Sequence, residues 1–109
     1  MMKGCSKVFE WNQTENAIKF INKDHKPFHL YGFSKGAESV SIIMRQINRQ
    51  PVYIITVGAW HTVDLDFSPY GVNFHNYFDD SGSKQKSPGL RINNVPHMMM
   101  QDHVNQYYK

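Results

Sequence analysis

Hydrophobic positions recur along the chain with two spacings, one typical of helices and the other of strands. Apolar residues three and four positions apart predict a helix that starts at the N-cap candidates Asn12 and Thr14 and ends near residue 22. The same spacing predicts a second helix over residues 37–48. A third helix is expected over residues 97–108, because Pro96 suits the first turn of a helix.

Strand-like runs lie between these helices. Residues 52–57 are almost all apolar and β-branched, which is typical of a strand buried on both faces of a parallel sheet. Apolar and polar residues alternate over residues 72–78, and shorter runs predict strands over residues 7–11, 28–33 and 90–95. This order predicts a single α/β domain over residues 1–109, with three layers, a mostly parallel sheet of about five strands and helices on both faces.

Composition excludes several classes of protein. The 109 residues are 40% hydrophobic and 19% charged, which rules out disorder, collagen and coiled coil. We expect no transmembrane segment and no signal peptide, since no apolar stretch is long enough for either. The single cysteine, Cys5, excludes an internal disulfide and a four-cysteine zinc site, and predicts a cytoplasmic location. The net charge of +3, without a stripe of lysine and arginine, does not argue for nucleic-acid binding.

Ser34 lies in the pattern Gly-x-Ser-x-Gly of residues 32–36, where a predicted strand meets a predicted helix. A tight bend at this place lifts a serine hydroxyl above the sheet edge, and the flanking glycines remove side chains that would collide across the bend. The helix N-terminus favours a developing oxyanion there, and the Lys35 N–H is a natural donor to it. The alternative interpretation is an ordinary turn in which Ser34 caps the helix.

These residues resemble the α/β-hydrolase superfamily, and most of all its lipase-like members. The resemblance begins at residues 29–37, continues through residues 54–59 and covers roughly residues 28–108. Trp60 and His61 stand where fungal-type lipases have proline and arginine, so the match is partial there. The resemblance implies a trimmed hydrolase fold and a serine esterase activity that needs no cofactor.

A serine nucleophile needs an imidazole as its base and a carboxylate that orients the imidazole. The chain order of the hydrolases implies Asp79 or Asp80 as the acid and His97 as the base. Both positions follow predicted strands at the carboxyl edge of the sheet, where Ser34 also lies. Asp64 is an alternative acid, and an alignment that puts Asn93 at the acid position would leave the triad broken.

Other histidines are weaker candidates. His61, His75, Asp64 and Asp66 could join His97 as metal ligands, but no two histidines have the spacing of a strong zinc motif, so no metal is expected. His103 falls inside the last predicted helix, where a surface or packing role is expected.

The second oxyanion donor is predicted from topology. A right-handed crossover would place the strand at residues 7–11 beside the strand at residues 28–33, which brings the following loop next to Ser34. We therefore predict the backbone N–H groups of Trp11 and Asn12 as donors, although Asn12 is also a helix cap candidate.

The trimmed sheet leaves one face thinly covered. Met98, Met99 and Met100 cannot all face one core, which favours a contact with an acyl group, a second copy of the chain or a protein partner.

Three functional hypotheses follow. The first is a serine hydrolase that cleaves a small-molecule ester or related acyl bond, with no cofactor, no metal and no nucleic-acid partner. The second is a catalytically inactive binding or assembly protein that keeps a hydrolase-like scaffold. The third is a metal-dependent hydrolase.

Overall fold

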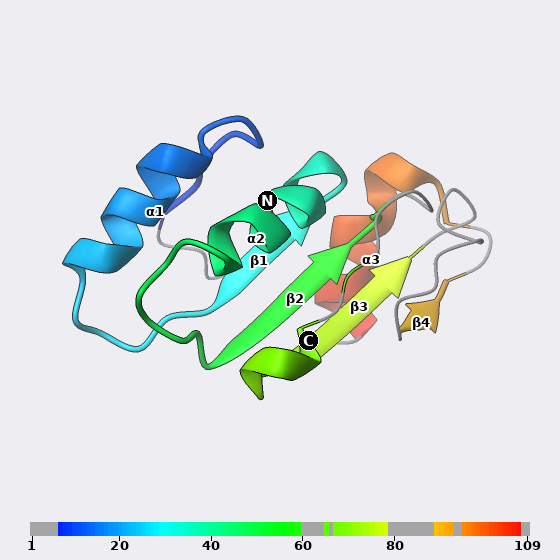
Figure 1. Cartoon of the computed structure of the whole chain (residues 1–109). Helices are drawn as coiled ribbons and strands as arrows, with labels where there is room; N and C mark the ends of the chain where they lie inside the picture. Colours follow the sequence, from blue (N-terminus) through cyan, green and yellow to red (C-terminus); the bar gives the residue numbers. More distant parts are fainter. Residues whose placement is uncertain (1–6, 60–64, 66, 79–88, 93–94, 108–109) are drawn as a thin grey trace.

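The computed structural model describes residues 7–59, 65, 67–78, 89–92 and 95–107. It is an α/β arrangement, which confirms the predicted fold class at that level (Figure 1). Its elements in chain order are α1 (Thr14–Lys23), β1 (Leu30–Phe33), α2 (Lys35–Met44), β2 (Tyr53–Val57), the 3-10 turn η1 (Ser68–Tyr70), β3 (Asn73–Phe78), β4 (Leu90–Arg91), the 3-10 turn η3 (His97–Met99) and α3 (Met100–Tyr107).

Four parallel strands form one sheet in the order β1-β2-β3-β4. The register pairs Phe33 with Val57 and Val57 with Tyr77, so the carboxyl ends of β1, β2 and β3 lie at one edge. The connections after β1 and after β4 both leave from this edge. The topology thus brings the chain around Ser34 close to the chain around His97.

The strand predicted over residues 7–11 is not formed, and that prediction is wrong. Residues 7–10 have no regular structure, and a turn follows them. The Gln13 N–H donates to the carbonyl of Glu10 at 2.9 Å, and the Gln13 side chain accepts from the Glu10 N–H at 2.8 Å. The apolar residue of this run that turns inward, Phe9, packs on Phe20 of α1 with 6.0 Å between ring centroids. The run therefore folds back on the helix instead of extending the sheet.

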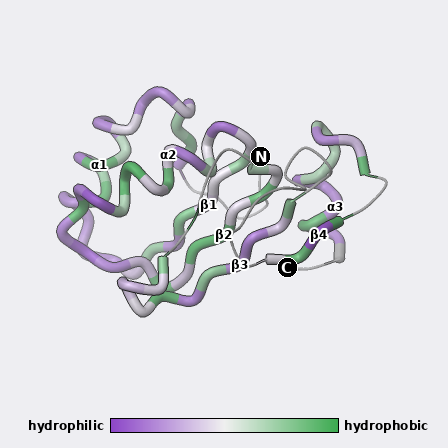
Figure 2. The backbone as a smooth tube through the Cα atoms, turned by 45° about the vertical axis from the view of Figure 1, so that its right-hand side comes forward, coloured by the Kyte–Doolittle hydropathy of each residue, from purple (hydrophilic) through white to green (hydrophobic). Residues whose placement is uncertain are grey.

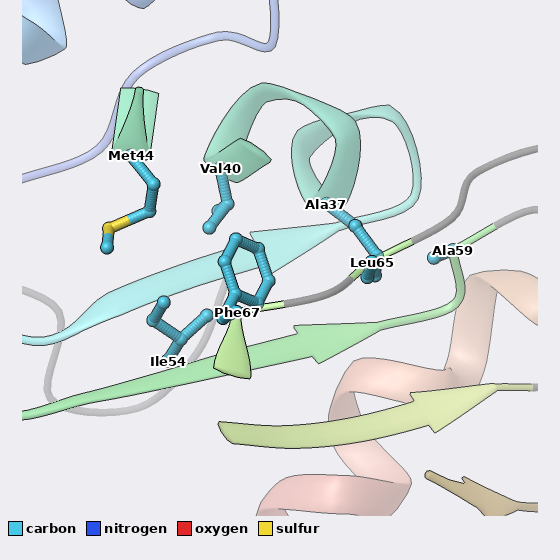
Figure 3. Packing of buried hydrophobic residues seen from close by; sticks show 7 residues of the cluster. All are labelled: Ala37, Val40, Met44, Ile54, Ala59, Leu65 and Phe67. Atoms are coloured by element: carbon cyan, nitrogen blue, oxygen red, sulfur yellow. The ribbon is translucent and has the colours of Figure 1, made fainter. Parts of the chain in front are cut away.

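The two faces of the sheet are covered by different helices. Ile54 packs with α2 residues Val40 and Met44 in a core that Figure 3 shows from close by. Ile55 and Val57, which alternate with it, pack with residues of α3 on the other face. As predicted, β2 is buried on both faces. In Figure 2 this strand is largely hydrophobic, whereas the connection between α1 and β1 is hydrophilic.

Helix α1 is packed on α2 and ends at Lys23, close to the predicted end near residue 22. Its N-cap position is Gln13, between the two candidates Asn12 and Thr14. The carboxylate of the C-cap residue Asp24 accepts hydrogen bonds from the backbone N–H groups of His25 at 2.8 Å and Lys26 at 3.2 Å. The hydrogen bond from the Lys26 N–H is the main cause of a lowered pKa of the Asp24 carboxyl. Desolvation opposes it, and the His25 N–H and the positive charges of Arg49 and Lys26 add to the lowering.

The carboxyl-terminal part is shorter in regular structure than predicted. The strand expected over residues 90–95 is limited to Leu90–Arg91, and the helix expected over residues 97–108 begins as a 3-10 turn. The three methionines separate as predicted: Met100 is buried in the core, whereas Met98 and Met99 are exposed. Among the helices of the described ranges, none has the length and apolar character needed to cross a bilayer.

Candidate active site

Ser34 lies at the bend between β1 and α2, as the sequence predicts. Its backbone has φ 56° and ψ −118°, and it is the one non-glycine residue with positive φ in the described part of the chain. Its N–H donates to the carbonyl of Val57 at 2.9 Å, and its own carbonyl accepts from the Ala37 N–H at 3.1 Å. A non-glycine residue held in such a conformation costs about 1–3 kcal/mol, which the flanking strand and helix must offset. This is the strand–turn–helix geometry that exposes a nucleophilic serine.

Of the two glycines that flank Ser34, one is at a position where any side chain would collide with neighbouring backbone. A Cβ at Gly32 would lie 2.5 Å from the carbonyl oxygen of Gly36 and 2.7 Å from the Cα of Ala37, so the close approach of β1 and α2 depends on glycine there. A Cβ at Gly36 would meet no described atom within 4 Å. As far as the described residues show, the expectation that both glycines prevent a collision is therefore wrong for Gly36, on the first turn of α2.

The structure brings Ser34 and His97 together, although 63 positions separate them in the sequence. The distance from Ser34 Oγ to His97 Nε2 is 3.0 Å, within hydrogen-bond range for a nucleophile and its base. When the imidazole carries its proton on Nδ1, Nε2 accepts the hydrogen bond from the serine hydroxyl.

Several neighbours hold the His97 imidazole in this place. The ring of Phe33 stacks on it, with 5.3 Å between centroids and 24° between planes. On another side lies Gly58, with φ +69°, where an added Cβ would be 2.9 Å from His97 Cε1 and 3.2 Å from Nδ1. The turn η3 carries His97, and the buried Met100 that follows anchors it to the core. The position of His97 thus depends on residues at the ends of β1 and β2.

The Lys35 backbone N–H fits the predicted role of an oxyanion donor. Lys35 is the first residue of α2, so its N–H has no acceptor within the helix. It directly follows Ser34 and lies at the positive end of the helix dipole.

Trp11 contacts α2, although the strand predicted over residues 7–11 is not formed. The carbonyl of Trp11 accepts a hydrogen bond from Ser39 Oγ at 2.5 Å, and the Lys35 ammonium lies 4.6 Å from the centroid of the Trp11 ring. The structure therefore places Trp11 and the adjoining Asn12 beside the first turns of α2. The contact is made by the Trp11 carbonyl and ring, and the role of the two N–H groups as donors stays a prediction.

The predicted acids lie outside the described residues. This applies to Asp79 and Asp80 and to the alternative positions Asp64 and Asn93. The strand before Asp79, β3, ends at Phe78 at the carboxyl edge of the sheet. The choice of the carboxylate stays a prediction.

Of the other candidate histidines, His75 and His103 lie in β3 and α3, and His61 lies outside the described residues. His75 is on β3, opposite Ile55, and packs edge-on against Tyr53 with 6.4 Å between centroids. His103 lies in α3, as expected. His61 is outside the described residues, and among the residues that are described no three histidine, cysteine or acidic side chains gather as metal ligands.

Sequence reasoning missed two residues that shape the site. Gly58 follows a buried strand directly, and a glycine at that place is a signal of close approach that could have indicated it. Phe33, by contrast, carries no signal that distinguishes a residue stacked on an imidazole from an ordinary core residue.

Comparison of the chain with models of protein families, with curated proteins and with solved structures finds no match. The functional argument accordingly depends on the geometry of Ser34 and His97.

Proposed function

We propose that this protein is a serine hydrolase of the esterase or lipase-like kind, which cleaves a small-molecule ester or related acyl bond. The observation that carries the proposal is the 3.0 Å contact between Ser34 Oγ, on a strained strand–helix bend, and His97 Nε2. A serine that merely caps a helix needs neither this backbone conformation nor a base beside its hydroxyl.

The reaction uses the residues in their predicted roles. His97 takes the proton of the Ser34 hydroxyl as Oγ attacks the acyl carbon, and a tetrahedral oxyanion forms. The Lys35 N–H, with the backbone of Trp11 and Asn12, stabilises this oxyanion. His97 then gives the proton to the leaving alcohol, and water releases the acyl group from Ser34 in a second, equivalent step. Asp79 or Asp80 orients the imidazole.

The proposal also includes the number of strands, the layers of the fold and what covers its sheet. A trimmed α/β-hydrolase of three layers has about five strands, one more than the four that are described. A second copy of the chain or a protein partner would cover the thinner face of its sheet, and a cytoplasmic location suits its single cysteine.

The alternative of an inactive hydrolase-like binding protein makes an opposite prediction for the site. It favours a serine and a histidine separated by well over the hydrogen-bond distance of about 3 Å. The contact between Ser34 and His97 supports the hydrolase instead.

The test is hydrolysis of para-nitrophenyl esters with short and medium acyl chains. The Ser34→Ala variant should lose at least about 10³-fold in kcat/KM if Ser34 is the nucleophile. The control is Ser41→Ala, which removes a half-buried hydroxyl further along α2 and should leave the rate unchanged. Equal activity of the Ser34→Ala variant and the wild type would exclude the proposed role.

A further inference from the structure

A groove on the outer side of α1 is separate from the candidate active site. Residues 7–9 lie along this helix and form the groove with five residues from Gln13 to Lys23, and its volume is about 480 Å³. In Figure 1 the segment before α1 runs beside the helix. The complete lining is Lys7, Val8, Phe9, Gln13, Asn16, Lys19, Phe20 and Lys23.

The charged residues of this groove all have the same sign. Three lysines line it, and no aspartate or glutamate does. Lys7 Nζ lies 5.7 Å from the centroid of the Phe9 ring and 5.8 Å from that of Phe20, at the outer limit of a cation–π contact. Three ammonium groups around one open groove create a positive potential that attracts anions.

Apolar side chains beside these lysines are unusually exposed. Val8 is 60% exposed and Phe20 44%. Both line the groove together with the three lysines. The exposed apolar side chains and the lysines therefore form one surface, which we call the α1 surface and define as the groove lining.

This combination matches the chemistry of an anionic lipid bilayer. Lysines on the polar side of an amphipathic element attract anionic headgroups, while tryptophan, phenylalanine and aliphatic side chains enter the boundary of the acyl chains. A nucleic acid would satisfy the lysines but would not bury Val8. Arginine, which favours bidentate phosphate contacts, is absent from the lining of the groove.

We propose that the α1 surface is a docking site for a membrane that contains anionic phospholipid. Lys7, Lys19 and Lys23 contact the headgroups, and Val8 and Phe20 enter the interface. The proposal does not depend on the hydrolase activity, because none of these five residues belongs to the candidate active site.

The test is co-sedimentation of the full chain with vesicles of equal parts phosphatidylserine and phosphatidylcholine, compared with vesicles of phosphatidylcholine alone. We expect binding to the mixed vesicles, weaker binding to the neutral ones and a loss of binding as salt rises. The double variant Lys19→Gln/Lys23→Gln should lower the partition coefficient about 25-fold, since each surface lysine contributes about fivefold.

A matched control distinguishes the effect of the groove lysines on binding from the effect of the protein's net charge. The variant Lys26→Gln/Arg45→Gln removes the same charge from exposed positions outside the groove and should keep nearly all of the binding. Val8→Ser keeps the charge and should weaken binding about fivefold through lost apolar contact.

Three outcomes would overturn the proposal. They are equal losses in the groove variant and the control variant, no preference for anionic vesicles, and binding of single-stranded RNA through Lys19 and Lys23 with no binding of vesicles.

Discussion

Replacement of Gly58 by alanine should displace the His97 imidazole while leaving both residues of the Ser34–His97 pair unchanged in the sequence. The new Cβ would lie 2.9 Å from His97 Cε1. Carbon atoms in favourable contact are about 3.5–4.0 Å apart, so the imidazole must move by roughly 0.6–1.1 Å. Its stacking on Phe33 restricts where it can go.

The expected loss of activity follows from the hydrogen bond that this movement disturbs. The Oγ–Nε2 distance is 3.0 Å, and a displacement of about 1 Å takes the pair out of productive geometry. A misplacement of this size costs on the order of 10²-fold in rate, so we expect kcat/KM of Gly58→Ala to fall about 100-fold. Because φ at Gly58 is +69°, alanine also costs about 1–2 kcal/mol in the free energy of unfolding.

Gly71→Ala is the control that distinguishes the effect of backbone strain at positive φ from the effect of a collision with His97. Gly71 has φ +65°, close to that of Gly58, but a Cβ there meets no described atom within 4 Å. Both variants should lose similar stability in urea unfolding, while Gly71→Ala keeps its rate of ester hydrolysis. If Gly58→Ala hydrolyses esters as fast as Gly71→Ala, the reasoning about the placement of His97 is refuted.

Three further predictions concern stability and are measured by urea unfolding. Gly32→Ala should lower the free energy of unfolding by about 2–3 kcal/mol, because the new Cβ would meet backbone atoms of α2. Gly36→Ala should raise it by about 0.5–1 kcal/mol, and similar effects of the two substitutions would contradict the packing described. Thr56→Val removes the buried hydroxyl that donates to Asn76 Oδ1 at 2.9 Å and should cost about 1–3 kcal/mol, and a neutral result would count against that contact. Because folding lowers the pKa of Asp24, its carboxylate stabilises the protein at pH values above its ordinary pKa of 3.8. The free energy of unfolding of the wild type should therefore exceed that of Asp24→Asn near neutral pH, and this excess should disappear as the pH falls from about 5 to 2. A difference in stability that does not depend on pH would contradict this prediction.

The sheet was predictable where the sequence pattern reflects burial on both faces. Residues 53–57 form a central parallel strand because their β-branched side chains fill cores on both sides. The run at residues 7–11 also contains strand-forming Val8, Phe9 and Trp11, but Phe9 packs on Phe20 of α1, and a turn between Glu10 and Gln13 ends the extended chain. Local pattern does not reveal which tertiary partner an apolar residue will have.

The candidate site was predictable from the order of the strands and the residues that follow them, and only partly from the spacing of residues within the Gly-x-Ser-x-Gly motif. A parallel sheet places Ser34 and His97 at the same edge, because each follows a strand end, and Ser34 Oγ lies 3.0 Å from His97 Nε2. The two glycines of the motif look equivalent in the sequence, yet Gly32 is packed against backbone and Gly36 is open. That difference depends on the path of α2 over β1, which no residue type encodes by itself.

The central claim is that Ser34 is a nucleophile activated by His97. Its most direct test is reaction of the folded protein with a fluorophosphonate, followed by mass spectrometry of the peptides. We predict one covalent adduct, located on Ser34, which forms quickly in the wild type, slowly in His97→Gln and not at all in Ser34→Ala. An unmodified Ser34 in the folded wild-type protein, or labelling at the same rate in His97→Gln, would contradict the claim.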